Sequence, residues 1–325
     1  MTKQILPGIY KTDIPIPNNP LKSLNCYIIQ SGDSSLVIDT GFNRPECRQA
    51  LFESLDDLAV DLAKAKVFIT HMHTDHAGLA ADLAREGAEL YCSLEDAEFI
   101  NSGDTPFLAM DQFIRIGGFP AADLQTAFKT HPGYKYRNLE HVDFKIVADG
   151  DLLTVGDFHF SCIKTPGHTR GHMCLYEKEK KLLFSGDHIL HGITPNISLW
   201  SYSFDPLRSY LDSLEIVLRL DVSLVLPGHR AKFTDLGGRI TELRQHHETR
   251  IKEVLSILKE KPQNAYQVAA QMTWALNYDT FEQFPVPQKW FAAGEALAHL
   301  KYLEGENLVT RTSREGSLIF AATMT

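Results

Sequence analysis

The sequence has few cysteines, and their spacing does not combine them into a site. Five occur in 325 residues, none of them in a C-x-x-C pair. Cys26, Cys162 and Cys174 lie within apolar runs, so we interpret them as small buried hydrophobic residues. This pattern excludes a disulfide framework and a structural zinc knuckle.

Long apolar segments are also missing. Residues 1–8 contain no apolar region of the signal-peptide type, and no later stretch approaches the length that spans a membrane. The formal net charge of −9 disfavours a general nucleic-acid binder. A G-x-S-x-G pattern, which would indicate a serine nucleophile, is absent. These absences predict a cytoplasmic protein without a membrane or nucleic-acid partner.

Residues 71–76 carry the strongest functional signal. They read His-Met-His-Thr-Asp-His and follow the apolar run 67–70, where a buried strand would end. Three imidazoles and a carboxylate so close together are costly to bury unless a cation organises them. Extended residues two apart point the same way, so His71 and His73 can bind one ion from one side. Asp75 and His76 are expected on a loop entering a helix over residues 78–86, where they can hold a second ion.

Three later segments each deliver one further ligand-type residue. A β-rich run and a Pro-Gly turn precede His168 and also His229, and a strand followed by Gly186 precedes Asp187. Glycine and proline suit a strand that must stop abruptly while other backbone approaches closely. The three segments therefore predict ligands delivered at the carboxyl ends of strands.

The order of these residues resembles the metallo-β-lactamase superfamily. The stretch 165–172, Thr-Pro-Gly-His-Thr-Arg-Gly-His, is most similar to its glyoxalase II-like branch, and the resemblance covers about residues 5–235. It implies an α/β fold, a four-layer αββα sandwich. It also implies that one ion is bound by His71, His73 and His168, a second by Asp75, His76 and His229, and that Asp187 bridges the two.

The resemblance extends to residues near these ligands. It implies that Asp39 orients a histidine ligand and that His172 supports the site from behind. Two ions about 3.5–4 Å apart would hold a bridging hydroxide and polarise the oxygen of the substrate. Asp75 is the expected catalytic residue, which orients this nucleophile and shuttles its proton. We favour two Zn²⁺ ions, although iron and manganese suit the same ligands.

The chain length and the pattern along it predict two domains. The first, residues 1–235, is the hydrolase domain with an insert at about 99–145 that is rich in large apolar side chains, among them Phe107, Met110, Phe113 and Phe119. The insert is either a mobile lid over the metals or a packed helical segment. Residues 192–210, with Trp200, form either the opposite pocket wall or core.

Residues 236–325 predict a small winged-helix-like α+β domain. Helices are expected over 239–261, 265–276 and 288–305, with a break at Gly237-Gly238, and a hairpin is expected around residues 314–316. Residues 239–325 contain ten Lys or Arg and ten Asp or Glu, a balance that does not favour phosphate binding. We therefore expect this domain to pack against the core or against a second subunit of a homodimer, and to help close the active site.

Several substrates are compatible with these residues. The first hypothesis is a binuclear hydrolase of a small activated acyl compound, a thioester or a lactone. A metal-dependent ribonuclease is the alternative, although the sequence lacks a basic groove. An iron-dependent sulfur oxidoreductase such as a persulfide dioxygenase, and a winged-helix regulator that senses metal, are further alternatives. A secreted β-lactamase would require a signal peptide.

Overall fold

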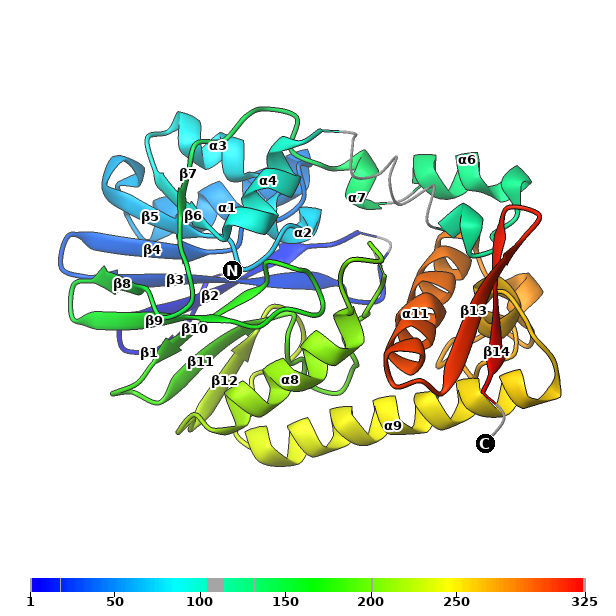
Figure 1. Ribbon diagram of the computed structural model, residues 1–325. Coiled ribbons are helices and arrows are strands. Elements are labelled where there is room, and N and C mark those ends of the chain that lie inside the picture. The colour runs from blue at the N-terminus through cyan, green and yellow to red at the C-terminus, as the bar shows by residue number, and fades with distance from the viewer. Residues whose placement is uncertain (1, 18, 104–113, 131, 200, 324–325) are drawn as a thin grey trace.

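The structure is a computed structural model that describes residues 2–323 except 18, 104–113, 131 and 200. Two β-sheets pack face to face, and helices cover both outer faces (Figure 1). A smaller unit of helices and a hairpin lies at one end of this sandwich. The predicted four-layer αββα sandwich with a small C-terminal unit is confirmed.

The first sheet has seven strands that follow one another in chain order. Neighbouring strands are antiparallel from the first to the fourth strand and parallel from the fourth to the seventh. The strands are β1 (Lys3–Leu6), β2 (Ile9–Pro15), β3 (Ser23–Ser31), β4 (Ser34–Ile38), β5 (Ala65–Phe68), β6 (Glu89–Cys92) and β7 (Phe144–Ile146).

The second sheet has five strands, and only its β11–β12 pair is parallel. In spatial order they are β12 (Leu224–Pro227), β11 (Leu182–Gly186), β10 (Met173–Glu177), β9 (Phe158–Lys164) and β8 (Leu152–Val155). The strand ends after β5, β9, β11 and β12 are the ones that the sequence predicts to carry ligands.

Both faces of the central strands are buried, which explains why their sequences are continuously apolar. In β10, Met173 and Leu175 point into the core between the two sheets, while Cys174 and Tyr176 point outward to the helices. This alternation follows from the two-residue period of a strand. The buried state of Cys174 and its neighbours agrees with the interpretation of the cysteines as core residues.

Helices on the outer face of the first sheet precede and follow β5 and β6. They are α1 (Pro45–Asp57), the 3₁₀ turn η1 (Leu62–Lys64), α2 (Thr74–Ala77), α3 (Ala80–Arg85) and α4 (Leu94–Asn101). The second sheet is covered by α8 (Pro206–Leu218) and by the start of α9 (Leu236–Glu260), whose apolar residues share one core with Leu183 and Val225.

The insert packs onto the C-terminal unit through α6 (Ala121–Thr130), and α7 (Pro132–Lys135) follows it. Phe119 contacts the ring of Trp290 edge to face, with centroids 5.8 Å apart. Phe107, Met110, Phe113 and Trp200 lie outside the described residues. The described part of the insert therefore contributes to a packed core, and its mobility stays a prediction.

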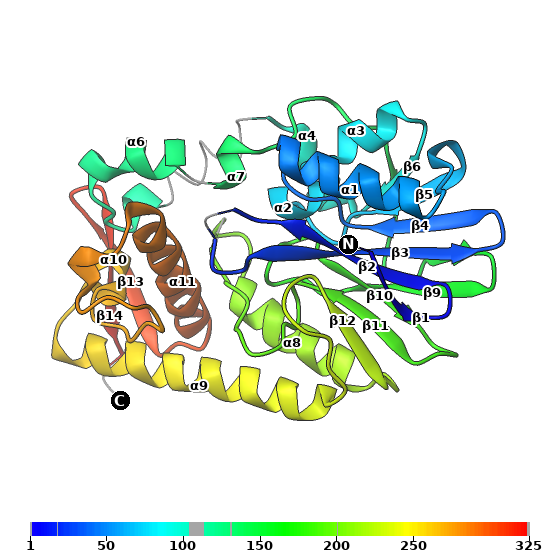
Figure 2. The same ribbon diagram turned by 180° about the vertical axis from the view of Figure 1, so that it is seen from behind.

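The C-terminal unit contains helices and a hairpin in the predicted order. After α9 come α10 (Ala265–Ala269), the 3₁₀ turn η2 (Phe281–Gln283), α11 (Val286–Gly305), β13 (Val309–Arg314) and β14 (Ser317–Ala322). Figure 2 shows α9 running from the second sheet to this unit along one edge of the molecule. One continuous apolar cluster joins the two parts, so the expected packing of this unit against the core of the first domain is confirmed.

Two expected helix limits are wrong. Gly237 and Gly238 do not break the chain; they lie in the first turn of α9, because the Asp235 side chain accepts a hydrogen bond from the Gly238 amide at 2.8 Å. The second helix ends at Ala269 instead of residue 276. There the Trp274 indole donates to the Ala269 carbonyl at 2.8 Å, which satisfies a carbonyl at the helix end.

Within the described ranges, no helix combines the length and the apolar character that crossing a bilayer requires.

Candidate metal centre

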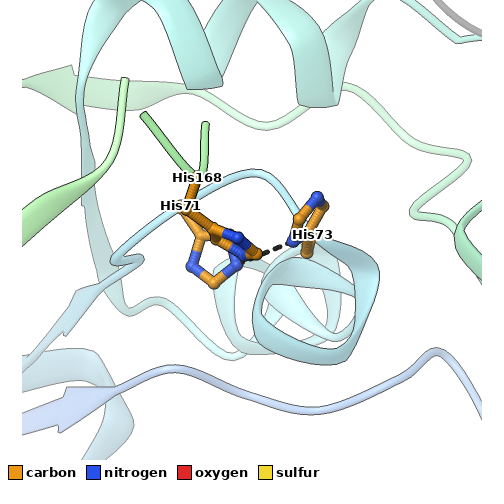
Figure 3. A group of neighbouring side chains, drawn as sticks. All are labelled: His71, His73 and His168. Carbon is orange, nitrogen blue, oxygen red and sulfur yellow. Dashed lines mark hydrogen bonds between the residues drawn. The ribbon is translucent and has the colours of Figure 1, made fainter. Parts of the chain in front are cut away.

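The predicted ligand residues meet at one edge of the sandwich, beside the C-terminal unit. His71 and His73 follow β5 and face each other, with His71 Nε2 3.0 Å from His73 Nδ1 (Figure 3). His168, in the turn between β9 and β10, places its ring centroid 4.9 Å from that of His71 and 4.5 Å from that of His73. These three side chains form one group with the geometry of a metal site.

A second group contains Asp75, His76 and His229. His229 Nε2 lies 3.3 Å from Asp75 Oδ2 and 3.3 Å from His76 Nε2. The expectation that Asp75 and His76 lie on a loop is wrong, because both belong to the short helix α2, with His73 at its N-cap. This helical turn brings Asp75 and His76 close to His229, which follows β12. His76 also stays beside the first group, because its ring centroid lies 4.0 Å from that of His71.

Asp187 lies between the two groups. Its Oδ1 is 3.6 Å from His76 Nε2, and its Oδ2 is 3.7 Å from His168 Nε2 and 3.5 Å from His229 Nε2. The structure thus brings together all seven residues that the sequence predicts as ligands, with one carboxylate shared by both sides.

In four of these histidines, the ring nitrogen that faces away from the centre already contacts another protein group. His76 Nδ1 is 2.7 Å from Asp39 Oδ2, and His71 Nδ1 is 3.0 Å from the Thr70 hydroxyl, which itself donates to Asp39. His168 Nδ1 and His229 Nδ1 donate to the backbone carbonyls of residues 196 and 23, at 2.8 and 2.9 Å. Such contacts leave Nε2 directed at the centre and fix the ring orientation.

Asp39 and His172 therefore lie where the resemblance implies. Asp39 contacts His76, and the Asp187 amide donates to His172 Nε2 at 3.1 Å while the other ring nitrogen of His172 contacts the Thr165 hydroxyl at 2.8 Å. Asp39 also has a left-handed backbone, with φ of 60°, which ends β4 abruptly next to the site.

Asp96 is a residue of the site that the sequence analysis missed. Its carboxylate accepts hydrogen bonds from the Met72 amide at 2.9 Å, the Thr169 hydroxyl at 2.6 Å and the Gly171 amide at 2.9 Å. It thereby joins the loop of His71 and His73 to the loop of His168. No local pattern reveals this role, because the partners lie 24 to 75 residues away.

Electrostatics divide the centre into two sides. Burial lowers the pKa of His71 and His168, and it lowers that of His73 to about 3, so these imidazoles are neutral donors. Burial opposes the charge of His76 and His229 too, but nearby aspartates outweigh it and raise their pKa. The pKa of Asp187 is held well below its usual range despite burial, because His229 and His76 favour its ionised form.

These donors fit a pair of divalent cations. Among the described residues, His168 Nε2 and Asp187 Oδ1 are buried without a hydrogen-bond partner, although both face the centre. Neutral imidazoles and ionised carboxylates are the ligands of zinc, iron and manganese. A bound cation would satisfy both atoms and balance the buried carboxylates, and the residues present therefore fit the implied metals.

The family match agrees with this geometry. Residues 20–229, more than half of the chain, match the family described as the metallo-beta-lactamase superfamily. The chain belongs to the metallo-β-lactamase superfamily. Residues 251–323 match a second family, the metallo-beta-lactamase-like C-terminal domain, which begins within α9.

Relatives of this superfamily align over the full fold. The probable metallo-hydrolase YqjP of Bacillus subtilis is 27% identical over 92% of this chain and 92% of its own length. A crystal structure of a metallo-beta-lactamase family protein from Thermus thermophilus superposes with a TM-score of 0.85 at 27% identity, over 98% of this chain and 100% of that one.

Fungal relatives of the superfamily are longer than the matched region. The atrochrysone carboxyl ACP thioesterase of Aspergillus fumigatus is 27% identical over 76% of this chain but only 48% of its own length. The matches to the lactamase-like proteins aptB of Emericella nidulans and nscB of A. fumigatus span 62% and 57% of those proteins.

Proposed function

We propose that the protein is a binuclear metal-dependent hydrolase of a small activated acyl compound, a thioester or a lactone. The observation that carries this proposal is the convergence of seven ligand-type side chains on two adjoining positions that share Asp187. In this proposal one ion is held by His71, His73 and His168, the other by Asp75, His76 and His229, and Asp187 contacts both.

The protein's own residues would then position the reactants. When bound, the ions would supply a water nucleophile that is active at neutral pH and would polarise the acyl oxygen. Asp75 reaches the adjoining pocket with a side chain that is 17% exposed, and its carboxylate would orient the attacking water and accept its proton. Opposing effects of burial and of the charges of His76 and His229 hold the pKa of Asp75 at about 2, so it is ionised.

The chain's relatives support hydrolysis more than they support the alternative functions. One relative is a thioesterase by name and another a probable metallo-hydrolase. A ribonuclease would need cations beside the metals, yet the described residues that line the adjoining pocket include neither lysine nor arginine. We favour zinc as the metal over manganese, because five of the seven proposed ligands are imidazoles, which suit zinc better than they suit manganese.

The test is hydrolysis of an S-acyl N-acetylcysteamine thioester and of a simple lactone by zinc-loaded protein. We expect release of free thiol or of acid, loss of both after chelation, and recovery when zinc but not calcium is returned, because calcium prefers oxygen ligands. Metal content per chain is measured in the same samples. Inactivity toward all thioesters and lactones, combined with cleavage of RNA or oxygen consumption with a persulfide by iron-loaded protein, would refute the proposal.

A further inference from the structure

A pocket of about 290 Å³ opens from the metal centre toward the C-terminal unit. The loop at residues 190–199 and α11 form much of its wall, and His73, Asp75, His168 and Asp187 form its inner end. The sequence predicts either pocket wall or core for residues 192–210, and residues 193–196, 198 and 199 line the pocket.

The character of this wall is apolar and uncharged. Charge among the described lining residues is confined to the metal-centre end. The wall beyond it is formed largely by aliphatic and aromatic side chains, among them Phe42, Ile114, Leu199, Trp290 and Phe291. An apolar pocket with few polar groups binds a ligand by removing apolar surface from water. A carboxylate or phosphate placed here would lose its hydration, and the described lining residues offer it no lysine or arginine in return.

Helix α11 brings the C-terminal unit into this wall. Trp290, Phe291 and Gly294 line the pocket. A Cβ atom at Gly294 would lie 2.8 Å from Ser198 Oγ, so glycine lets α11 approach the 190–199 loop. The Leu199 amide donates to the Gly294 carbonyl at 3.2 Å and fixes this approach.

We propose that this pocket binds an uncharged apolar acyl chain or ring of the substrate, and that α11 limits its size. The inference rests on the proposed function, which places the reacting carbonyl at the metals. It narrows the substrate class to compounds in which the chain or ring attached to the reacting carbonyl is uncharged. It also assigns the selection among such acyl groups to Phe291 and Trp290 of the C-terminal unit.

Alkyl hydroxamates test this proposal without turnover, because their head group binds metals and their tail enters the pocket. With zinc-loaded protein, octanohydroxamate is expected to bind on the order of tenfold or more tighter than acetohydroxamate, as added methylenes are buried. Butanohydroxamate is expected to bind tighter than succinohydroxamate, which has the same chain length and ends in a carboxylate. Calorimetry gives each dissociation constant.

A matched pair of variants locates the effect. Phe291→Ala should weaken octanohydroxamate on the order of tenfold while acetohydroxamate is unchanged. Phe52→Ala, on α1 and outside the pocket, should change neither. Equal constants along the series, with hydrolysis intact, would overturn the apolar pocket alone. Failure of every hydroxamate to bind would overturn the pocket together with the metal centre of the proposed function.

A separate contact links the same helix to a metal-site histidine. The Asn196 carbonyl accepts the hydrogen bond of His168 Nδ1 at 2.8 Å, while the Asn196 side-chain amide donates to Glu295 Oε2 on α11 at 3.2 Å. The Ser198 hydroxyl donates to the other end of that amide at 2.6 Å. Both ends of the Asn196 side chain are thus held, and its backbone carbonyl is fixed beneath His168.

Glu295 is itself held in place from α9. Its side chain is 12% exposed, and Oε1 lies 3.7 Å from Arg250 Nη2. Glu253 is a second carboxylate on Arg250, with Oε2 3.0 Å from Nη1, but it contacts the Thr273 amide rather than Asn196. Both glutamates therefore contact the Arg250 guanidinium, and Glu295, unlike Glu253, also contacts Asn196.

We infer that Glu295 is a positioning residue that orients His168 through Asn196. In Glu295→Ala we expect zinc affinity, measured by competition with a chromogenic chelator, to fall on the order of tenfold, at the low end of losses for groups that orient metal ligands. Glu295→Gln keeps an acceptor for Asn196 and should restore most of the affinity.

Glu253→Ala is the control, since it disturbs Arg250 without touching Asn196. It should leave zinc affinity near that of the parent. Equal losses in Glu295→Ala and Glu253→Ala, or no loss in the first, would overturn the inference. If Glu295→Ala does not fold, Asn196→Ala removes the same contact and should show the same loss; parent affinity in that variant would also overturn it.

Discussion

Zinc-loaded Asp187→Ala protein is expected to retain almost no metal, whereas the parent retains about two ions per chain. Asp187 is the carboxylate within 3.7 Å of histidines from both groups, so its loss weakens both positions and leaves the surrounding imidazoles without a shared anion. His73→Ala is expected to retain about one ion, because His73 belongs only to the group with His71 and His168.

Metal analysis after gel filtration, with circular dichroism of each variant, measures this difference. Asp143→Ala is the control: its side chain is fully exposed and belongs to neither ligand group, so metal content and hydrolysis should match the parent. Two ions per chain in folded Asp187→Ala, with parental turnover, would contradict the shared role of Asp187. Hydrolysis should be lost in Asp187→Ala and strongly reduced in His73→Ala.

The second large effect is expected from Gly228→Ala, which removes no ligand. A Cβ atom at this position would lie 2.7 Å from Asp187 Oδ1 and 2.8 Å from His76 Cε1. The Gly228 backbone cannot retreat, because its amide donates to the Gly186 carbonyl and its carbonyl accepts from the Asn25 amide, at 2.8 and 2.7 Å. The two side chains must therefore move.

We expect zinc affinity in Gly228→Ala to fall at least on the order of tenfold, as when groups that orient ligands are removed. Overpacking should lower the free energy of unfolding by about 1–3 kcal/mol. Gly237→Ala is the matched control, because its added methyl group meets its nearest neighbour, Leu218 Cδ1, at 4.0 Å in the first turn of α9. Chelator competition and urea unfolding test both variants; parental zinc affinity in Gly228→Ala would show that the centre tolerates the methyl group.

Local sequence is sufficient for the strands that precede the ligands and for the ligand types. Each ligand follows its strand within eight residues, and strand ends are signalled by glycine and proline, as at Gly186 and Gly228. The hairpin around residues 314–316 is predicted in the same way and is present as β13–β14. Periodicity also locates α9 and α11, although with errors at their ends.

The errors occur where one short-range hydrogen bond, rather than the apolar period, decides where a helix begins or ends. The cap from Asp235 extends α9 through two glycines, and the Trp274 indole caps the Ala269 carbonyl where α10 ends. The helical turn at Asp75 begins at the His73 carbonyl, which accepts from the amides of His76 and Ala77 at 2.9 Å. Such choices depend on single hydrogen bonds that composition and period do not encode.

The sequence by itself determined the seven residues proposed to bind metal, because strand ends and ligand chemistry are both written within a few consecutive residues. The order of those residues also carried the resemblance to the metallo-β-lactamase superfamily, which implied the αββα fold. Only the tertiary structure decided how those residues are oriented and what lies beside them. Asp96 reaches partners up to 75 residues away, and Glu295 meets Asn196 across 99 residues. The apolar pocket likewise exists only because α11 packs against the 190–199 loop, since side chains from distant segments enclose a cavity only after the chain has folded.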